Sequence, residues 1–237
     1  RACPPVLRAV LKILCVLCVL YGLNFAQKPV GLGWIWQNPK PQGNALLAIH
    51  FGKDKLTGFA VGADGTILQT SDGGFNWKSQ LAPVNTIFAS VFVKDKNRAV
   101  AVGARGAILA TENGGREWRE IKTDAKDHLS GVTFVGEELQ FGWAVGTYGR
   151  ILQTIDGGLT WKSQNSNTTE HLLKVSFLSP LEGAAVGVGG VVLTTTDGGA
   201  TWRSSVPCPG TAMTNAIFPA RGRIVAAGFG GCLARSD

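Results

Sequence analysis

Short apolar runs separated by glycine-rich turns fill the chain from about residue 45 onward. Apolar residues alternate with polar ones, or follow one another, over stretches of five or six residues, which is typical of β-strands. In the first such region we predict strands at residues 46–51, 58–62, 66–70 and 76–80, named a, b, c and d in order. The β-branched residues and the closely spaced glycines exclude a helical solenoid.

This pattern repeats about every 41 residues. Ala60-Val61-Gly62 recurs at intervals of 41, 43 and 41 residues, and Ala226-Ala227-Gly228 follows after another 41. A tryptophan stands 15 residues after each of the first four glycines and closes the phrase Asp/Asn-Gly-Gly-x-x-Trp. Four antiparallel strands in about 40 residues form one blade of a β-propeller, so we predict an all-β propeller. The phrases are marked by Asp72 and Trp77, Asn113 and Trp118, Asp156 and Trp161, and Asp197 and Trp202.

The Asp-Gly-Gly-x-x-Trp phrase resembles the Asp-box, or BNR, repeat. An Asp or Asn side chain at its start can accept hydrogen bonds from backbone N–H groups two and three residues on, while glycine tolerates the positive φ of the turn. The tryptophan supplies a large apolar surface between blades. Because these carboxylates occur once per blade and lie far apart, we interpret them as structural residues and not as acid/base pairs.

The two ends of the repeat region complement each other. Trp36 lies 41 residues before Trp77, where the tryptophan of a preceding unit would stand, and the last unit, residues 211–237, contains only strands a, b and c. We predict that Trp34–Asn38 supplies the missing strand d and closes a ring of five blades, which removes exposed sheet edges. The alternative is that the sequence is part of a larger ring.

An apolar segment precedes the repeats. Residues 13–27 carry no charge and follow Arg1, Arg8 and Lys12, the pattern of a signal-anchor helix or a cleaved export signal. We expect an uncleaved transmembrane helix at residues 1–27, a linker and closing strand at 28–44, and the propeller at 45–237. The positive flank predicts a single-pass protein with a cytoplasmic N-terminus and a propeller in the periplasm or a lumen such as that of the thylakoid.

Composition argues against several functions. The chain has 23 Lys and Arg against 16 Asp and Glu, a mild and scattered excess that does not indicate nucleic-acid binding. It contains no phosphate-binding loop and no dinucleotide motif, and His50, His128 and His171 do not occupy matching positions, so we expect neither cofactor nor metal. Tyr148 is the one tyrosine outside the apolar segment and has no acidic partner at a matching position. We therefore expect no enzyme, and a sialidase-like glycan-binding or glycan-hydrolysing protein is a weaker alternative.

Ala-Val-Gly in strand b and Asp-Gly-Gly-x-Thr-Trp before strand d resemble the photosystem II stability/assembly factor family of BNR propellers. Residues 36–44 resemble that family's entry into its first blade, so the resemblance covers about residues 34–237. It implies a non-enzymatic, membrane-anchored scaffold that binds an integral membrane protein complex, such as a photosynthetic reaction centre, as assembly factor or accessory subunit. Some relatives are encoded beside resistance-nodulation-division-type exporters, so a periplasmic transporter subunit is an alternative. The family usually has seven blades.

Two further features point to specific residues. The b–c turns need only glycine and small residues, yet they contain Arg105, Tyr148, Arg150 and Phe229. Arginine and aromatic residues often anchor protein interfaces, and two guanidinium groups on one face could pair with carboxylates of a partner. Cys208 and Cys232 flank the last blade on this same face, so we predict a disulfide between them, with two free thiols as the alternative.

Overall fold

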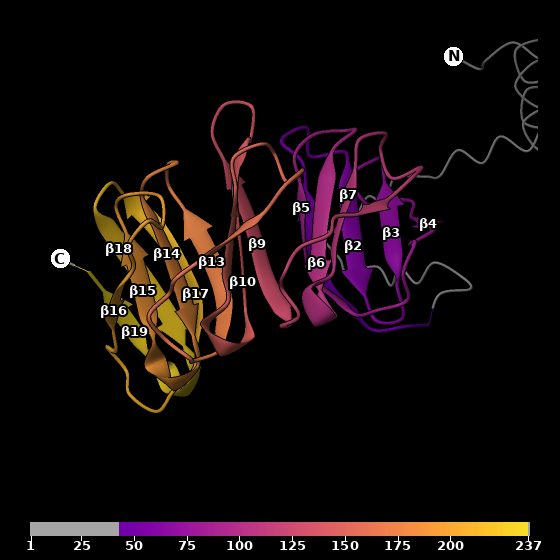
Figure 1. Ribbon diagram of the computed structural model, residues 1–237. Helices are drawn as coiled ribbons and strands as arrows, with labels where there is room; N and C mark the ends of the chain where they lie inside the picture. Colours follow the sequence, from indigo (N-terminus) through magenta and orange to yellow (C-terminus); the bar gives the residue numbers. More distant parts are fainter. Residues whose placement is uncertain (1–42, 237) are drawn as a thin grey trace, which may run out of the picture. The chain divides into compact units, whose positions relative to one another are not determined.

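The computed structural model describes residues 43–236, which form five antiparallel β-sheets in chain order (Figure 1). The predicted anchor at residues 1–27 and the predicted closing strand with Trp36 lie outside these residues. Within the described part, no helix has the length and apolar character needed to cross a bilayer. The sheets are β1 (Leu46–Phe51), β2 (Gly58–Gly62), β3 (Ile67–Thr70) and β4 (Lys78–Gln80); β5 (Phe88–Val93), β6 (Ala99–Gly103), β7 (Ile108–Thr111) and β8 (Arg119–Glu120); β9 (Leu129–Val135), β10 (Phe141–Gly146), β11 (Ile151–Thr154) and β12 (Lys162–Gln164); β13 (Leu172–Phe177), β14 (Gly183–Gly187), β15 (Val192–Thr195) and β16 (Arg203–Ser205); and β17 (Met213–Ala220), β18 (Arg223–Gly228) and β19 (Leu233–Arg235).

Each sheet is a meander of hairpins, as a propeller blade requires. In the first four blades the strand order follows the chain, a to d, and the fifth sheet has three strands in the described residues. The first two predicted strands agree with β1 and β2, and the next two begin one and two residues later than predicted. Strand b is buried over its whole length in the first, second and fourth blades, and in the third every residue of β10 except the half-buried Phe141 is buried, because neighbouring strands flank strand b within the sheet and apolar side chains cover it on both faces.

The hydrophobic core of residues 43–236 consists of four clusters, and each lies between two successive blades. Val61 and Ile67 of the first blade, for example, pack with Phe88 and Val91 of the second. The other clusters join the second blade to the third, the third to the fourth, and the fourth to the fifth. A single blade would leave these apolar faces in water, so the blades stabilise each other pairwise.

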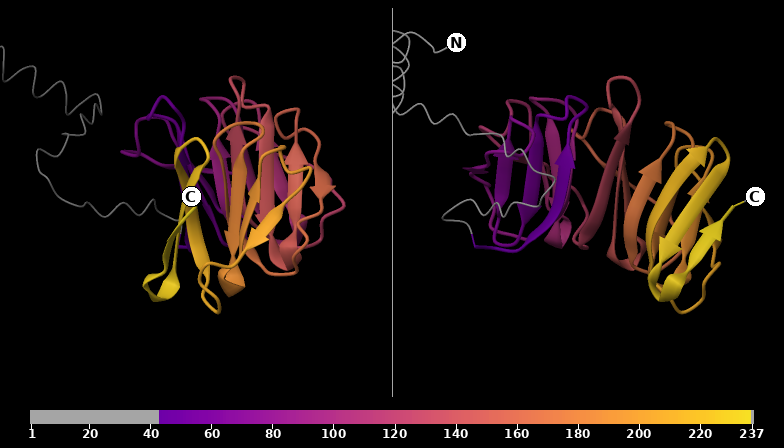
Figure 2. Two further views of the ribbon diagram at one scale, coloured as in Figure 1. Left: turned by 90° about the vertical axis from the view of Figure 1, so that its left-hand side faces the viewer. Right: turned by 180° about the vertical axis from the view of Figure 1, so that it is seen from behind.

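The outer faces of the first and last blades are uncovered in the described residues. Ile49 of β1 is 60% exposed, although Val91, at the same position of the next blade, is 4% exposed. On the last blade Leu233 is 72% exposed, whereas the equivalent Ile67 is fully buried. The first and last sheets stand at opposite ends of the row of blades in the right-hand view of Figure 2. These residues therefore do not form the closed ring of five blades by themselves, and closure by Trp34–Asn38 stays a prediction.

The turns are divided between two sides of the row of blades, as expected from strand polarity. The Asp-box turns contact the a–b turns of their own blades, since Gly73 N–H donates to the Leu56 carbonyl and Gly198 N–H to that of Leu181. The b–c turns contact the connectors from strand d to the next strand a, as in the bond from Gly65 N–H to the Thr86 carbonyl. Two separate loop surfaces result.

Candidate functional site

The b–c turns share one backbone geometry. In four blades the turn is a short 3-10 segment: η1 (Ala104–Gly106), η2 (Thr147–Gly149), η3 (Val188–Gly190) and η4 (Phe229–Gly231). Its third residue is a glycine with positive φ, and a Cβ atom on Gly106 or Gly149 would lie 2.0 Å from a carbonyl oxygen of the adjacent connector. Glycine is therefore required at the third position of η1 and η2.

The second residue of the b–c turns also has positive φ, and three blades use a residue other than glycine there: Asp64, Arg105 and Tyr148. Arg105 has a φ of 58° and Tyr148 a φ of 56°, whereas Gly189 and Gly230 occupy the same position in later blades. The left-handed region costs a non-glycine residue about 1–2 kcal/mol. Strain of this kind at exposed positions is typical of residues retained for function, which supports Arg105 and Tyr148 as candidate binding residues.

Tyr148 is exposed but positioned by the next blade. Its side chain is 69% exposed, its backbone N–H donates to Nδ1 of His171 at 3.1 Å, and its ring meets the His171 ring edge to face at a centroid distance of 5.2 Å. Phe229 is 68% exposed at the first position of η4. We call Arg105, Tyr148 and Phe229 the turn surface, because they project from b–c turns on one side of the blades.

Arg150 differs from the expectation. Its Nε and Nη2 atoms contact Oδ2 of Asp127 at 2.7 and 2.6 Å, and Nη1 donates to Ser163 Oγ at 3.0 Å. This guanidinium is therefore already paired within the third blade and is a poor candidate for a partner's carboxylate. The side chain of Arg105 is exposed and forms no ion pair within residues 43–236, so the predicted pair of available guanidinium groups reduces to one.

Cys208 and Cys232 are joined by a disulfide, with 6.4 Å between their Cα atoms. Cys208 lies in the connector that enters the fifth blade, and Cys232 follows η4. The connector also covers the preceding blade, because a Cβ atom on Gly190 of η3 would lie 2.0 Å from the Cys208 carbonyl oxygen. The bond thus ties strand c of the three-stranded fifth sheet to the segment packed on the fourth.

The Asp-box residues hold their turns by hydrogen bonds, with one correction to the predicted pattern. The carboxylate or amide oxygen accepts from the backbone N–H four residues on, as Asp72 does from Asn76 at 2.9 Å, and in the third blade Asp156 also accepts from the group three residues on, as predicted, at 3.0 Å from Leu159. The Asp or Asn side chain also accepts a hydrogen bond from the hydroxyl of a threonine two positions earlier. The oxygen of this hydroxyl in turn accepts the backbone N–H of the second glycine. The four threonines, unnoticed in the sequence, are Thr70, Thr111, Thr154 and Thr195.

The carboxylates of these turns are held in the ionised form. The hydrogen bond from the backbone N–H of Asn76 is the largest cause that lowers the pKa of Asp72 to about 2. The hydroxyl of Thr201 contributes most to lowering the pKa of Asp197, also to about 2. A carboxyl group with such a low pKa is a poor proton donor near neutral pH. A structural role therefore fits these residues.

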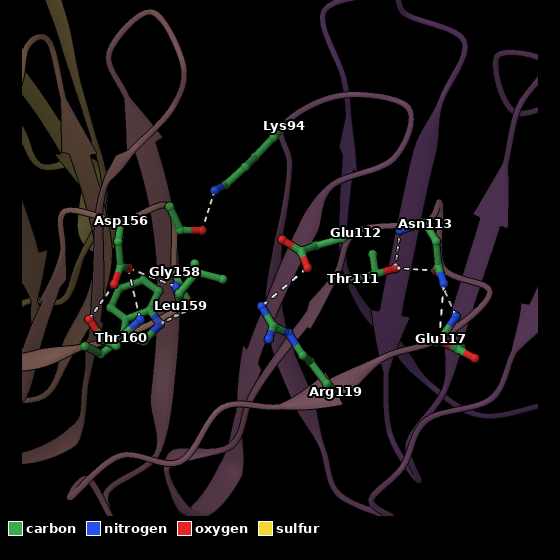
Figure 3. Close-up of polar contacts among 12 residues, drawn as sticks. Lys94, Thr111, Glu112, Asn113, Glu117, Arg119, Asp156, Gly158, Leu159 and Thr160 are labelled. Atoms are coloured by element: carbon green, nitrogen blue, oxygen red, sulfur yellow. Dashed lines mark hydrogen bonds and ion pairs between the residues drawn. The ribbon is translucent and has the colours of Figure 1, made fainter.

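The second blade exchanges donor and acceptor in its turn (Figure 3). Asn113 replaces the aspartate, and its Nδ2 donates to Glu117 Oε2 at 3.5 Å. In the third blade the Thr160 hydroxyl instead donates to Asp156 Oδ2 at 2.6 Å. In each turn one side chain of the pair donates and the other accepts. The second blade therefore accommodates Asn113 because the carboxylate of Glu117 accepts its hydrogen bond.

The Asp-box tryptophans pack at or near the blade interfaces. Trp118, Trp161 and Trp202 are buried, and Trp77 of the first blade is half-buried. Trp118 meets Phe59 of the preceding blade edge to face at 5.4 Å. The Nε1 of Trp161 donates to the carbonyl of Gly158 in its own turn at 3.1 Å. The structural reading of these residues therefore agrees with their surroundings.

Lys94 is a buried cation that the sequence pattern did not reveal. It follows β5, is 6% exposed, and places Nζ 4.2 Å from the centroid of the Phe134 ring in the third blade. The same Nζ donates to the carbonyl of Gly157 in the next Asp-box turn (Figure 3). Burial is the main cause that lowers the pKa of Lys94 to about 8. Lys94 thus connects the second blade to the third.

The histidines do not gather into a metal site. His50 accepts a hydrogen bond from the Val93 N–H through Nδ1, and His171 accepts one from Tyr148, so each is engaged with its neighbouring blade. Residues 43–236 contain no group of three or more His, Cys, Asp or Glu side chains placed to hold a metal ion.

Comparison with known proteins relates this architecture to one family. The sequence profile of the photosynthesis system II assembly factor YCF48 matches residues 34–131 and again residues 116–211. Similar solved structures include YCF48 bound to D1 peptide, with 18% identity, 82% of this chain and 94% of that chain covered, and a TM-score of 0.46. A second similar structure is YCF48 from Cyanidioschyzon merolae, with 19% identity, 83% of this chain and 97% of that chain covered, and a TM-score of 0.44.

An ancestral GH74 enzyme superposes with a TM-score of 0.63 at 15% identity, over 86% of this chain and 32% of that chain. At this identity the likeness shows the fold alone. A comparison with curated proteins gives no significant match.

Proposed function

The chain belongs to the family of the photosynthesis system II assembly factor YCF48, and from this premise we propose that it is a non-enzymatic scaffold that binds a reaction-centre membrane protein during assembly. A similar structure holds YCF48 with a D1 peptide, so a segment of a D1-like protein is the proposed partner. The residues that match the family profile include the turns η1 and η2 and the blades that contain them. No comparison favours a transporter subunit or a sialidase-like protein.

We place the proposed contact on the turn surface. The observation that carries this choice is the exposed, left-handed backbone of Arg105 and Tyr148, at a turn position where the fourth and fifth blades use glycine and the first uses Asp64. A guanidinium and two exposed aromatic rings suit a partner segment that carries both carboxylate and apolar side chains. Arg150 is not part of the proposed contact, because its guanidinium is already paired with Asp127 and Ser163.

The test exploits the strain. Replacing Arg105 and Tyr148 together by glycine removes both side chains and relieves two left-handed residues, so the variant should be at least as stable as the wild type. We expect it to lose capture of the reaction-centre protein from solubilised membranes of a phototroph. Asp64→Gly is the matched control, because Asp64 has a φ of 53° at the same turn position of the first blade, and it should retain the partner.

Full retention of the partner by the double variant would move the contact to another surface. Capture of an exporter in place of a reaction centre would refute the proposed partner and favour the transporter alternative. Turnover of a sialoside that disappears in Tyr148→Phe would refute the non-enzymatic role.

We further propose that residues 1–27 anchor the protein and that the propeller faces the periplasm or a thylakoid-lumen-like compartment. The Cys208–Cys232 disulfide supports this, because such bonds persist in oxidising compartments. Recovery of the protein in the soluble fraction after alkaline washing of membranes would contradict the anchor.

A further inference from the structure

The first strands of all five blades line one cavity of about 600 Å³. These strands, β1, β5, β9, β13 and β17, each stand at the end of their sheet, so one edge of each has no strand partner within residues 43–236. Apolar side chains line part of the wall, and hydroxyl groups line another part. The hydroxyl-bearing residues are Ser90, Ser130, Thr133 and Ser176.

Among the described residues, Lys174 of β13 is the only Lys, Arg, Asp or Glu side chain that lines this cavity. Lys174 is exposed to the cavity solvent and forms no ion pair within residues 43–236. A lone ammonium group in a cavity without acidic residues is complementary to an anionic ligand.

His50 lines the same cavity from β1 and supplies a fixed donor. Its Nδ1 accepts the N–H of Val93 at 3.0 Å, which places the proton of the neutral ring on Nε2. The ring stacks on Phe92 at a centroid distance of 4.5 Å, which restrains its orientation. Burial, and then the charge of Lys174, lower the pKa of His50, so the two side chains are near enough to influence each other.

We propose that this cavity binds the chain-terminal carboxylate of an extended peptide. Lys174 pairs with the carboxylate, His50 Nε2–H donates to it, and the free edges of the inner strands offer backbone partners to the preceding residues. A cavity of this volume with a few convergent polar groups is typical of a ligand site. The proposal concerns a site separate from the turn surface and stands independently of the proposed function.

The experiment uses the full chain and three probes: the peptide Ala-Val-Ser-Val-Ala with a free carboxylate, the same peptide with a C-terminal amide, and acetate. Nuclear magnetic resonance of the imidazole nitrogens, assigned with His50→Gln, reports on His50, and titration gives Kd. We expect the acid peptide to raise the pKa of His50 and to bind at least tenfold more tightly than either the amide or acetate.

Lys174→Met should weaken the acid peptide at least tenfold, whereas Lys162→Met, an exposed lysine of β12, should leave Kd unchanged. Equal binding of acid and amide, or no effect of Lys174→Met, would overturn the carboxylate site. Acetate binding as tightly as the peptide would overturn the peptide assignment, and absence of binding by all three probes would overturn both. The Arg105→Gly, Tyr148→Gly variant should bind the peptide normally, which separates this site from the turn surface.

Discussion

Lys94 should make stability depend on pH between about 8 and 10.5. Its pKa is lowered from 10.5 to about 8 in the folded protein, so over this range the folded state binds fewer protons than the unfolded state. Unfolding then takes up a proton, and the free energy of unfolding rises as the pH rises. Below pH 8 the ammonium is charged in both states, and the full cost of burying it is present.

The magnitude follows from the shift. One pKa unit corresponds to about 1.4 kcal/mol, so the shift sets an upper limit of about 3 kcal/mol. The hydrogen bond to Gly157 and the Phe134 ring remain beside the ammonium, and nearby solvent screens its charge. We therefore expect a gain of about 1–2 kcal/mol between pH 8 and 10 that depends on Lys94.

Urea unfolding followed by tryptophan fluorescence at pH 7.5 to 10 measures this gain for the wild type and for Lys94→Met. The difference between the two proteins should change with pH, because tyrosines and other groups that titrate in this range are common to both and cancel. Lys96→Met, an exposed lysine two residues on, is the control and should run parallel to the wild type. Parallel curves for Lys94→Met would refute the reasoning.

Three other outcomes are expected. Asn113→Asp should lower the free energy of unfolding by about 0.5–1 kcal/mol, because its new carboxylate faces Glu117. Adding Glu117→Thr should restore the lost stability, and a double variant no more stable than Asn113→Asp alone would contradict the pairing. Cys208→Ser should lower stability by about 3 kcal/mol, and a reducing agent should lower the melting temperature of the wild type but not of the variant. Trp118→Ala should cost about 3–5 kcal/mol by calorimetry; an equal loss in Trp36→Ala would support closure by the N-terminal strand, and a negligible one would argue against it.

The repeat made much of the fold predictable from the sequence. A strand pattern is local, because alternation and turn residues act within about ten positions, and four similar copies with constant internal spacing reduce the chance of error. β1 and β2 therefore fall at the predicted residues. The Cys208–Cys232 bond was also accessible, since strand polarity alone puts both cysteines on the same side of the last blade.

Side-chain contacts between residues far apart in the sequence were decided by the tertiary structure. The pairing of Arg150 with Asp127, and the insertion of Lys94 beside Phe134, join residues 23 or more positions apart through side-chain geometry that a strand pattern does not encode. The same holds for His50 and Lys174, which line one cavity from different blades.

The uncovered faces of the first and last blades show the same division. The sequence determined the apolar character of Ile49 and Leu233, since each occupies a position whose equivalents are apolar in the other blades. Whether such a side chain is buried depends on the neighbour that packs against it, and only the packing of whole blades supplies or withholds that neighbour. Local pattern thus fixes what a face is made of, and tertiary structure decides what covers it.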